Sequence, residues 1–170
     1  MTPKQKLITL LESKKAPDIK NAITLNKTLN ILTEDEVFKI VYNQYDWNKE
    51  GGNWVLLEEY PNHPTWKKII TISLQKYGLK SLPSSIENLT NLQVLILRDN
   101  FLTTLPKEIG NLKELRQISL MGNREMKHLP KEMGKLRKLE KLNLKFTDLT
   151  WDNVPKNLHR LVSHNLPHPF

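Results

Sequence analysis

The residues of this chain that could do chemistry are few, and their spacing does not assemble a catalytic or metal site. Asp46, Asn48 and Glu50 offer oxygen ligands, but their spacing does not fit a calcium-binding loop. A histidine cluster has no carboxylates near it and lies in a proline-containing segment that we interpret as a solvated tail: His159, His164 and His168. Glycine-rich phosphate loops and the motifs GxSxG and HExxH are absent. The sequence therefore predicts no enzyme, no metal and no cofactor.

The net positive charge of the chain permits one kind of binding, to anionic partners. The chain has 170 residues and a formal net charge of +8, which permits binding to nucleic acid or to another anionic surface. However, lysine alternates with glutamate, as in "KEIGNLKELR", and this pattern is typical of a solvated surface. Nucleic-acid binding is therefore an alternative rather than the main prediction.

The sequence lacks cysteine, a signal peptide and a membrane-spanning stretch, and these absences favour one cellular location. There is no cysteine, so disulfides and thiolate chemistry are excluded. The first 15 residues contain no apolar run of signal-peptide length, and no stretch approaches the roughly 20 apolar residues of a membrane span. We predict a cytoplasmic protein without a membrane span.

The elements that would have to position a binding site are defined by an internal repeat. Leucine and isoleucine recur at spacings near three and then at a spacing of two, so the pattern alternates between helical and strand periods. Four consecutive segments of 23, 23, 24 and 22 residues share this pattern, and they begin at Trp66, Leu89, Leu112 and Leu136.

The pattern LxxLxLxxNxLxxLPxxIxx resembles the leucine-rich repeat, particularly bacterial repeats of the Leptospira type and also plant intracellular ones. The second segment carries it almost completely, with Leu92, Leu95, Leu97, Asn100, Leu102, Leu105, Pro106 and Ile109. The resemblance covers about half of the chain. It implies an α/β fold, a short solenoid of about four to five parallel strands with an N-terminal helical cap.

Each position of the repeat pattern has a physical role. Leu95 and Leu97 are two residues apart, so they point inward from a short strand about 4.8 Å from the next strand. Asn100 and Asn123 follow the strands, where an amide can satisfy the backbone of the turn. Pro106 suits the beginning of a short helical or 3-10 segment. Because no repeat can bury its apolar face alone, the stack is the folding unit.

The end repeats depart from the pattern. Tyr77 and Thr147 replace the asparagine in the first and last segments, which indicates boundary repeats. The segment after Asn123 has one extra residue, so we expect a bulge there. We expect Trp151 to plug the last layer of the stack rather than to bind a partner.

The first 65 residues have a helical period instead. Thr2 is a candidate N-cap with Pro3 and Gln5 behind it, and Thr33 with Glu36 forms a capping box. Apolar residues at helical spacing mark the buried stripes: Leu7, Leu10, Leu11, Ile19, Ala22, Ile23, Val37, Val41 and Tyr45.

Glycines and prolines delimit the end of this region. Gly51 and Gly52 are expected to end the last helix, and Trp54 to Leu57 to form an irregular strand before the prolines at 61 and 64. We predict three parts: a helical capping region, the repeats, and a C-terminal cap or tail at 1–65, 66–157 and 158–170. The alternative is that the helices form a separate domain with its own partner site.

A partner is expected on the concave face, which is lined by the strand residues that point away from the core. These are Thr71, Ser73, Gln75, Val94, Ile96, Arg98, Gln117, Ser119, Met121, Lys141, Asn143, Lys145 and Phe146. Four are apolar where water is expected, and three basic residues surround them, a composition that favours an interface. Four strands span only about 15 Å, which suits one helix, loop or peptide.

The sequence thus predicts a non-catalytic protein-interaction module with an unidentified protein or peptide partner. A variant of this hypothesis is an antitoxin or immunity-type adaptor that neutralises an acidic partner. The competing interpretation of the face is that a helical segment folds over it, or that Phe146 packs on the C-terminal segment.

Overall fold

The computed structural model describes residues 1–13, 16–37, 52–162 and 166, and the chain divides into two compact units. The first unit is Met1–Asn62 and the second is His63–Phe170. This division falls three residues before the boundary predicted at residue 65. The interpretation of the first unit as a cap for the second stays a prediction.

The first unit is helical in its described part, with α1 (Pro3–Leu11), α2 (Ala16–Leu29) and α4 (Gly52–Glu59). The Oγ1 atom of Thr2 accepts the backbone N–H of Gln5 at 3.2 Å, which confirms the predicted N-cap. Helix α1 packs on α2, and α2 packs on α4. The predicted stripe residues form the core between them, with Leu10 partly exposed and the others buried: Leu7, Leu11, Ile19, Ala22, Ile23 and Val37.

The capping box at Thr33 is also confirmed. Glu36 Oε2 accepts the Thr33 backbone N–H at 2.8 Å, and Thr33 Oγ1 accepts the Glu36 N–H at 3.2 Å. This backbone hydrogen bond lowers the pKa of Glu36 below its ordinary value. Val41 and Tyr45, predicted for the helix that starts here, lie outside the described residues, as do Asp46, Asn48 and Glu50.

The strand predicted for Trp54 to Leu57 is wrong, because these residues belong to α4. Gly52 begins this helix rather than ending the previous one. Val55, Leu56 and Leu57 are all buried, so the segment is apolar on more than the one face that the period-2 interpretation assumed. A helix satisfies its own backbone hydrogen bonds, whereas an isolated strand in a helical unit would lack a neighbour.

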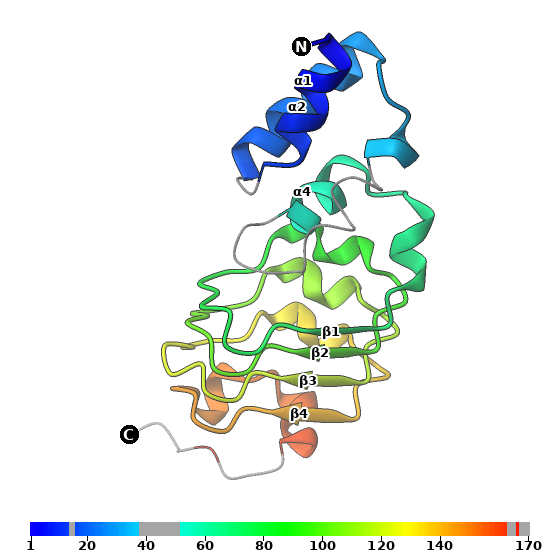
Figure 1. Cartoon of the computed structure of the whole chain (residues 1–170). Helices are drawn as coiled ribbons and strands as arrows, with labels where there is room; N and C mark the ends of the chain where they lie inside the picture. The colour runs from blue at the N-terminus through cyan, green and yellow to red at the C-terminus, as the bar shows by residue number, and fades with distance from the viewer. Residues whose placement is uncertain (14–15, 38–51, 163–165, 167–170) are drawn as a thin grey trace. The chain divides into compact units, whose positions relative to one another are not determined.

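The second unit is built on a parallel sheet of four strands in the order β1-β2-β3-β4, as predicted (Figure 1). The strands are β1 (Thr71–Ser73), β2 (Val94–Ile96), β3 (Gln117–Ser119) and β4 (Lys141–Asn143). Their register places Ile72, Leu95, Ile118 and Leu142 side by side, and all four are buried.

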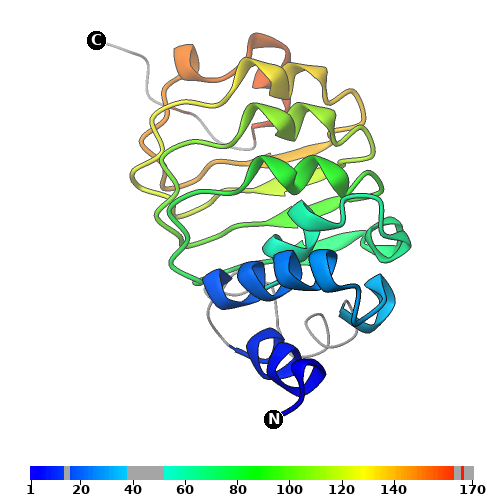
Figure 2. The ribbon, with the colours of Figure 1, turned by 90° about the horizontal axis from the view of Figure 1, so that it is seen from above.

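One short 3-10 helix precedes β1, and others follow each strand and form a row on the other side of the core (Figure 2). They are η1 (Pro64–Lys68), η2 (Ser84–Asn88), η3 (Lys107–Asn111), η4 (Lys131–Lys135), η5 (Trp151–Asn153) and η6 (Lys156–Leu161). Prolines occupy the N-cap positions of η2, η3, η4 and η6: Pro83, Pro106, Pro130 and Pro155. The first three have extended backbone. The prolines thus stand one position before the helices, close to where they were predicted.

The two buried asparagines of the repeats, Asn100 and Asn123, join neighbouring repeats. Asn123 Nδ2 donates to Leu97 O at 2.9 Å and to Leu120 O at 2.7 Å, and its Oδ1 accepts Leu102 N–H at 3.1 Å. Asn100 does the same one repeat earlier. The prediction that these amides satisfy the turn backbone is confirmed.

The repeats change at their C-terminal end. The extra residue after Asn123 is taken up by a turn over Arg124 and Glu125, and the chain re-enters the core at Met126. Trp151 is partly exposed and lies with its ring 4.8 Å from that of His159, and its predicted role as a plug of the last layer stays a prediction. Beyond it the sheet continues, since Val162 forms a parallel bridge with Leu142.

Candidate protein-interaction surface

The predicted concave residues lie in three rows across the strands. The register defines two of them, Thr71–Val94–Gln117–Lys141 and Ser73–Ile96–Ser119–Asn143. Backbone hydrogen bonds continue just past the strands, from Lys76 N to Arg98 O and from Asp99 N to Met121 O at 3.0 and 2.8 Å. They align the third row, Gln75–Arg98–Met121–Lys145.

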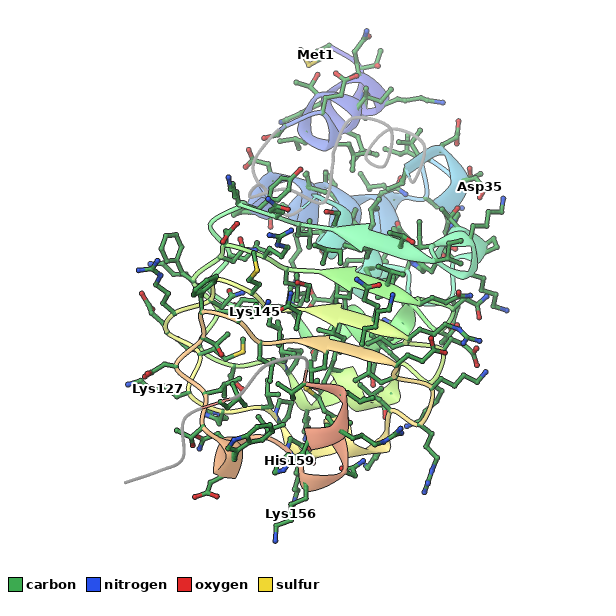
Figure 3. All side chains as sticks on the ribbon, turned by 90° about the horizontal axis from the view of Figure 1, so that it is seen from below. Met1, Asp35, Lys127, Lys145, Lys156 and His159 are labelled. Atoms are coloured by element: carbon green, nitrogen blue, oxygen red, sulfur yellow. The ribbon has the colours of Figure 1, made fainter. Side chains whose placement is uncertain are left out.

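These rows differ in exposure. The β1 residues of the face and both lysines are exposed, whereas Val94, Ile96 and Met121 are only partly exposed. Ser119 departs from the expectation most, because only 4% of its surface is exposed. The apolar residues therefore form the middle of the face, and Lys145 lies just beyond the end of β4 (Figure 3).

A groove of about 690 Å³ runs over β3 and β4. Its lining combines predicted face residues with the segment that bridges β4, and it includes Ile96, Arg98, Gln117, Ser119, Lys141, Asn143, Arg160, Leu161 and Val162. Sequence reasoning missed the last three because it treated residues from 158 onward as a cap or tail. The signal was present, since "VPKNL" before them repeats the "LPKEI" of an earlier repeat.

Polar groups in this groove are incompletely satisfied. One terminal nitrogen of the Arg98 guanidinium approaches Met121 Sδ at 3.6 Å, and Asn143 Nδ2 approaches the same sulfur at 3.9 Å. A thioether is a weak acceptor. Within the part of the chain that the structure describes, Arg98 Nε and Ser119 Oγ are buried and have no hydrogen-bond partner.

One edge of the face carries a column of left-handed backbone. Lys76, Asp99, Gly122 and Phe146 occupy equivalent positions in the four repeats, with φ of 63°, 54°, 81° and 58°. Glycine suits this position, because φ is positive and a Cβ at Gly122 would force the Asp99 carboxylate to move. Phe146 holds this unfavourable conformation with 69% of its surface exposed, and an exposed aromatic on a strained backbone is typical of binding positions.

The positive charge of the chain lies in the repeat unit. Residues 63–170 contain 18 Lys and Arg against nine Asp and Glu, a net charge of +9, whereas residues 1–62 contain eight against nine, a net charge of −1. A positively charged unit favours partners of the opposite sign.

The described ranges contain neither a metal-binding cluster nor a membrane-spanning helix. No group of three or more histidine and acidic residues there is arranged to hold a metal ion. His159 instead lies 2.9 Å through Nε2 from the Val154 carbonyl, and His164 and His168 lie outside the described residues. The helices described are all too short or too polar to cross a membrane.

Repeats of this register, with one short parallel strand and one 3-10 segment each and an asparagine between them, define a leucine-rich repeat solenoid. A family model described as a leucine-rich repeat region matches residues 67–166. The chain belongs to this family, as its repeat pattern indicated. The matched region extends past residue 157, where we predicted the repeats to end.

Solved structures with the same architecture come from bacteria and plants. A leucine-rich repeat protein of Leptospira interrogans is 36% identical with a TM-score of 0.52, over 62% of this chain and 27% of that protein. The plant peptide hormone receptor RGFR1, solved in complex with RGF2, is 28% identical with a TM-score of 0.52, over 70% of this chain and 18% of the receptor. The comparison with curated proteins gave no match.

The Leptospira match supports the predicted bacterial type of repeat. The chain spans only about a quarter of that protein's length, at 27%, so the similarity concerns the repeat architecture. Leucine-rich repeat folds commonly mediate protein–protein interactions and are typically binding modules rather than enzymes.

Proposed function

We propose that this protein is a non-catalytic interaction module whose concave face binds one segment of a protein partner. The observation that carries this proposal is the groove of about 690 Å³ over β3 and β4, which is open to solvent and mixes apolar and basic side chains. Ile96, Leu161 and Val162 supply its apolar part. A volume of about 690 Å³ accommodates a few side chains of a peptide or loop and is too small for a whole domain.

Phe146 extends the proposed surface beyond the groove. It is largely exposed, and its backbone is fixed in a conformation that is unfavourable for a phenylalanine. Aromatic side chains contribute strongly at interfaces because they bury a large area with little loss of conformational freedom. The bound segment in this proposal runs across the groove and contacts Phe146 at its edge.

The test compares partners recovered from the native lysate by the wild-type chain and by the double variant Ile96→Asp, Phe146→Asp. A control variant, Ser84→Asp with Thr90→Asp, adds the same two charges at exposed positions outside the strands. We expect a partner bound by the wild type and the control and lost from the double variant. Recovery of every partner by all three proteins would refute the concave site. Circular dichroism checks that each variant is folded.

Binding to nucleic acid is the second candidate, and a specific cluster favours it. Lys113, Lys135, Arg137 and Lys138 surround a hollow of about 440 Å³ between two repeats. However, Lys138 Nζ bonds Glu114 at 2.6 Å, and Lys113 Nζ donates to a backbone carbonyl. The cluster is thus partly engaged within the protein.

A salt titration separates the two candidates. Affinity for a nucleic acid falls steeply and linearly on a logarithmic scale as salt rises, because counterions are released on binding. We expect weak binding of double-stranded DNA that disappears at physiological salt. Tight binding there that is lost in Lys135→Gln, Arg137→Gln would make the nucleic-acid function the better one. A cytoplasmic location, or an immunity-type role against an acidic partner, is compatible with the interaction module and remains part of the hypothesis.

A further inference from the structure

We propose that the partner segment is acidic and that one of its Asp or Glu carboxylates is bound between Arg98 and Ser119. This inference rests on the proposed function, because it names the chemistry of the segment that occupies the same groove. It commits to a side-chain carboxylate of a protein.

The first argument is the pair of unsatisfied polar groups. Ser119 is 4% exposed, and both its hydroxyl and Arg98 Nε are buried without a hydrogen-bond partner in the described chain. Buried polar groups without partners cost free energy, so native proteins contain few of them, and those that exist call for an explanation. Both atoms are covered in the structure, so the Arg98 and Ser119 side chains must rotate toward the groove, and a bound carboxylate would then accept a hydrogen bond from each donor.

The second argument is their placement. Ile96 pairs with Ser119 in the sheet register, and Arg98 follows Ile96 by two residues, so it lies on the same face as a diagonal neighbour of Ser119. Both side chains line the groove. Among the described residues, one terminal nitrogen of the guanidinium donates to the thioether sulfur of Met121. A carboxylate oxygen is a far stronger acceptor than this sulfur.

The third argument is charge. Arg98, Lys141 and Arg160 all line the groove, and the single carboxylate among its lining residues is that of Glu140. Glu140 Oε1 bonds Arg116 Nη1 at 2.6 Å, outside the groove lining. The groove therefore presents positive charge that is not neutralised by its own lining, which complements an anionic segment.

The apolar part of the groove decides between an acidic peptide and a nucleic acid. Ile96, Leu161 and Val162 border the polar pair and offer contact to aliphatic groups. A nucleic-acid backbone carries a charge at every nucleotide and would place phosphates against these residues. An acidic peptide places one carboxylate at the polar pair and apolar side chains beside it.

The experiment begins with a phage-displayed library of random dodecapeptides selected on the full chain at physiological salt. We expect the selected peptides to share an Asp or Glu next to apolar residues. One of them is then synthesised with a C-terminal amide, both as selected and with that acid replaced by its amide, and affinities are measured by calorimetry. The acidic form should bind ~10–100-fold more tightly, the ratio expected for a charge-assisted hydrogen-bonded pair.

The variants assign this preference to the two residues. In Arg98→Met the acidic and amide peptides should bind with similar affinity, and Ser119→Ala should weaken the acidic peptide ~5–10-fold. Both variants remove an unsatisfied buried group, so they are expected to fold at least as stably as the wild type. Lys127→Met is the matched control, since it removes one positive charge from an exposed side chain that points away from the sheet (Figure 3). It should change affinity less than twofold.

The outcomes separate this inference from the proposed function. Peptides that bind the wild type but not Ile96→Asp, yet show no preference for the acid, would overturn the carboxylate and leave the groove as the binding site. Binding that requires a free C-terminus would assign the carboxylate to a chain end and also overturn it. Failure of the library to yield any binder, or binding unaffected by Arg98→Met and by Ile96→Asp, Phe146→Asp, would count against both.

Discussion

Removing the amide of Asn123 tests the asparagine connection between repeats directly. Asn123→Ala deletes three hydrogen bonds, to Leu97 O, Leu120 O and Leu102 N–H, in a site with 0% exposure. The two carbonyls keep a second donor, because Asn100 Nδ2 bonds Leu97 O and the Asn123 backbone bonds Leu120 O. The Leu102 N–H loses the one acceptor that the described chain provides for it.

The loss of stability can be worked out from these lost hydrogen bonds. Each of the two lost amide donors contributes about 0.5–1.5 kcal/mol net, and a buried orphaned N–H costs about 1–3 kcal/mol. We therefore expect Asn123→Ala to lower the free energy of unfolding by roughly 4 kcal/mol, the middle of the range that these terms give. For a chain of this size such a loss lowers Tm by about 8–16 °C.

Urea denaturation followed by circular dichroism measures this change, with two comparisons built in. Asn123→Thr should lose less, because Thr147 occupies the same place in the last repeat and its Oγ1 donates to Leu144 O at 2.7 Å. Asn91→Ala removes an exposed amide that bonds Lys67 O, and should cost less than about 0.5 kcal/mol. Equal effects of Asn123→Ala and Asn91→Ala would refute the reasoning.

The remaining predictions concern packing, backbone strain and ionisation. A Cβ at Gly110 would overlap the backbone carbonyl of Glu132, so Gly110→Ala should lower the free energy of unfolding by about 1–3 kcal/mol, measured by urea titration. A Cβ at Gly134 would lie 3.0 Å from a side-chain oxygen that can move, so Gly134→Ala should cost less. Phe146→Gly relieves a left-handed backbone and should raise stability by about 1 kcal/mol while weakening binding of a selected peptide. Burial, and to a lesser extent the nearby acidic side chains, raises the pKa of Tyr60 to about 12. An ultraviolet titration should therefore show one tyrosine that ionises at higher pH than the others in the wild type and is absent from Tyr60→Phe.

The sign of the Tyr60 effect on stability follows from linkage. Its pKa is higher in the folded state than the ordinary value of about 10, so the unfolded chain releases this proton first. The stabilisation is fully present below about pH 10 and is lost as the pH rises toward about 12. A Tyr60→Phe chain should therefore lose less stability over that interval than the wild type. Equal losses of stability in the two chains would contradict the raised pKa of Tyr60. Equal effects of Gly110→Ala and Gly134→Ala would contradict the prediction for the glycines. A Phe146→Gly chain less stable than the wild type would contradict the prediction for the left-handed backbone.

The repeat unit shows how far a periodic sequence determines structure. The pattern placed the inward leucines, the turn asparagines and the prolines because each depends on local geometry that recurs every 22 to 24 residues. The parallel order of strands follows, since a repeat can bury its apolar face only against its neighbours. The concave residues were predictable by the same alternation, and the structure places them in three aligned rows.

Where the period is absent, the sequence determined less. The N-cap at Thr2 and the capping box at Thr33 are local hydrogen-bonding patterns, and the structure has both Thr2 Oγ1 accepting from Gln5 N–H and the reciprocal pair of Thr33 and Glu36. The segment from Val55 to Leu57 was assigned to a strand because alternation and helical burial look alike in a short apolar run. In the structure this segment is helical because it packs against α2, and all three residues are buried there.

The sequence by itself determined the repeat, its register and which strand residues point away from the core. Only the tertiary structure decided that Ser119 is buried while its neighbours on the face are not, and that Arg98 turns toward Met121. It also brought Arg160 to Val162 beside β4 to complete the groove. The physical reason is that alternation fixes the side of a sheet on which a residue lies, whereas its burial and hydrogen bonding depend on which side chains from other strands come to rest against it.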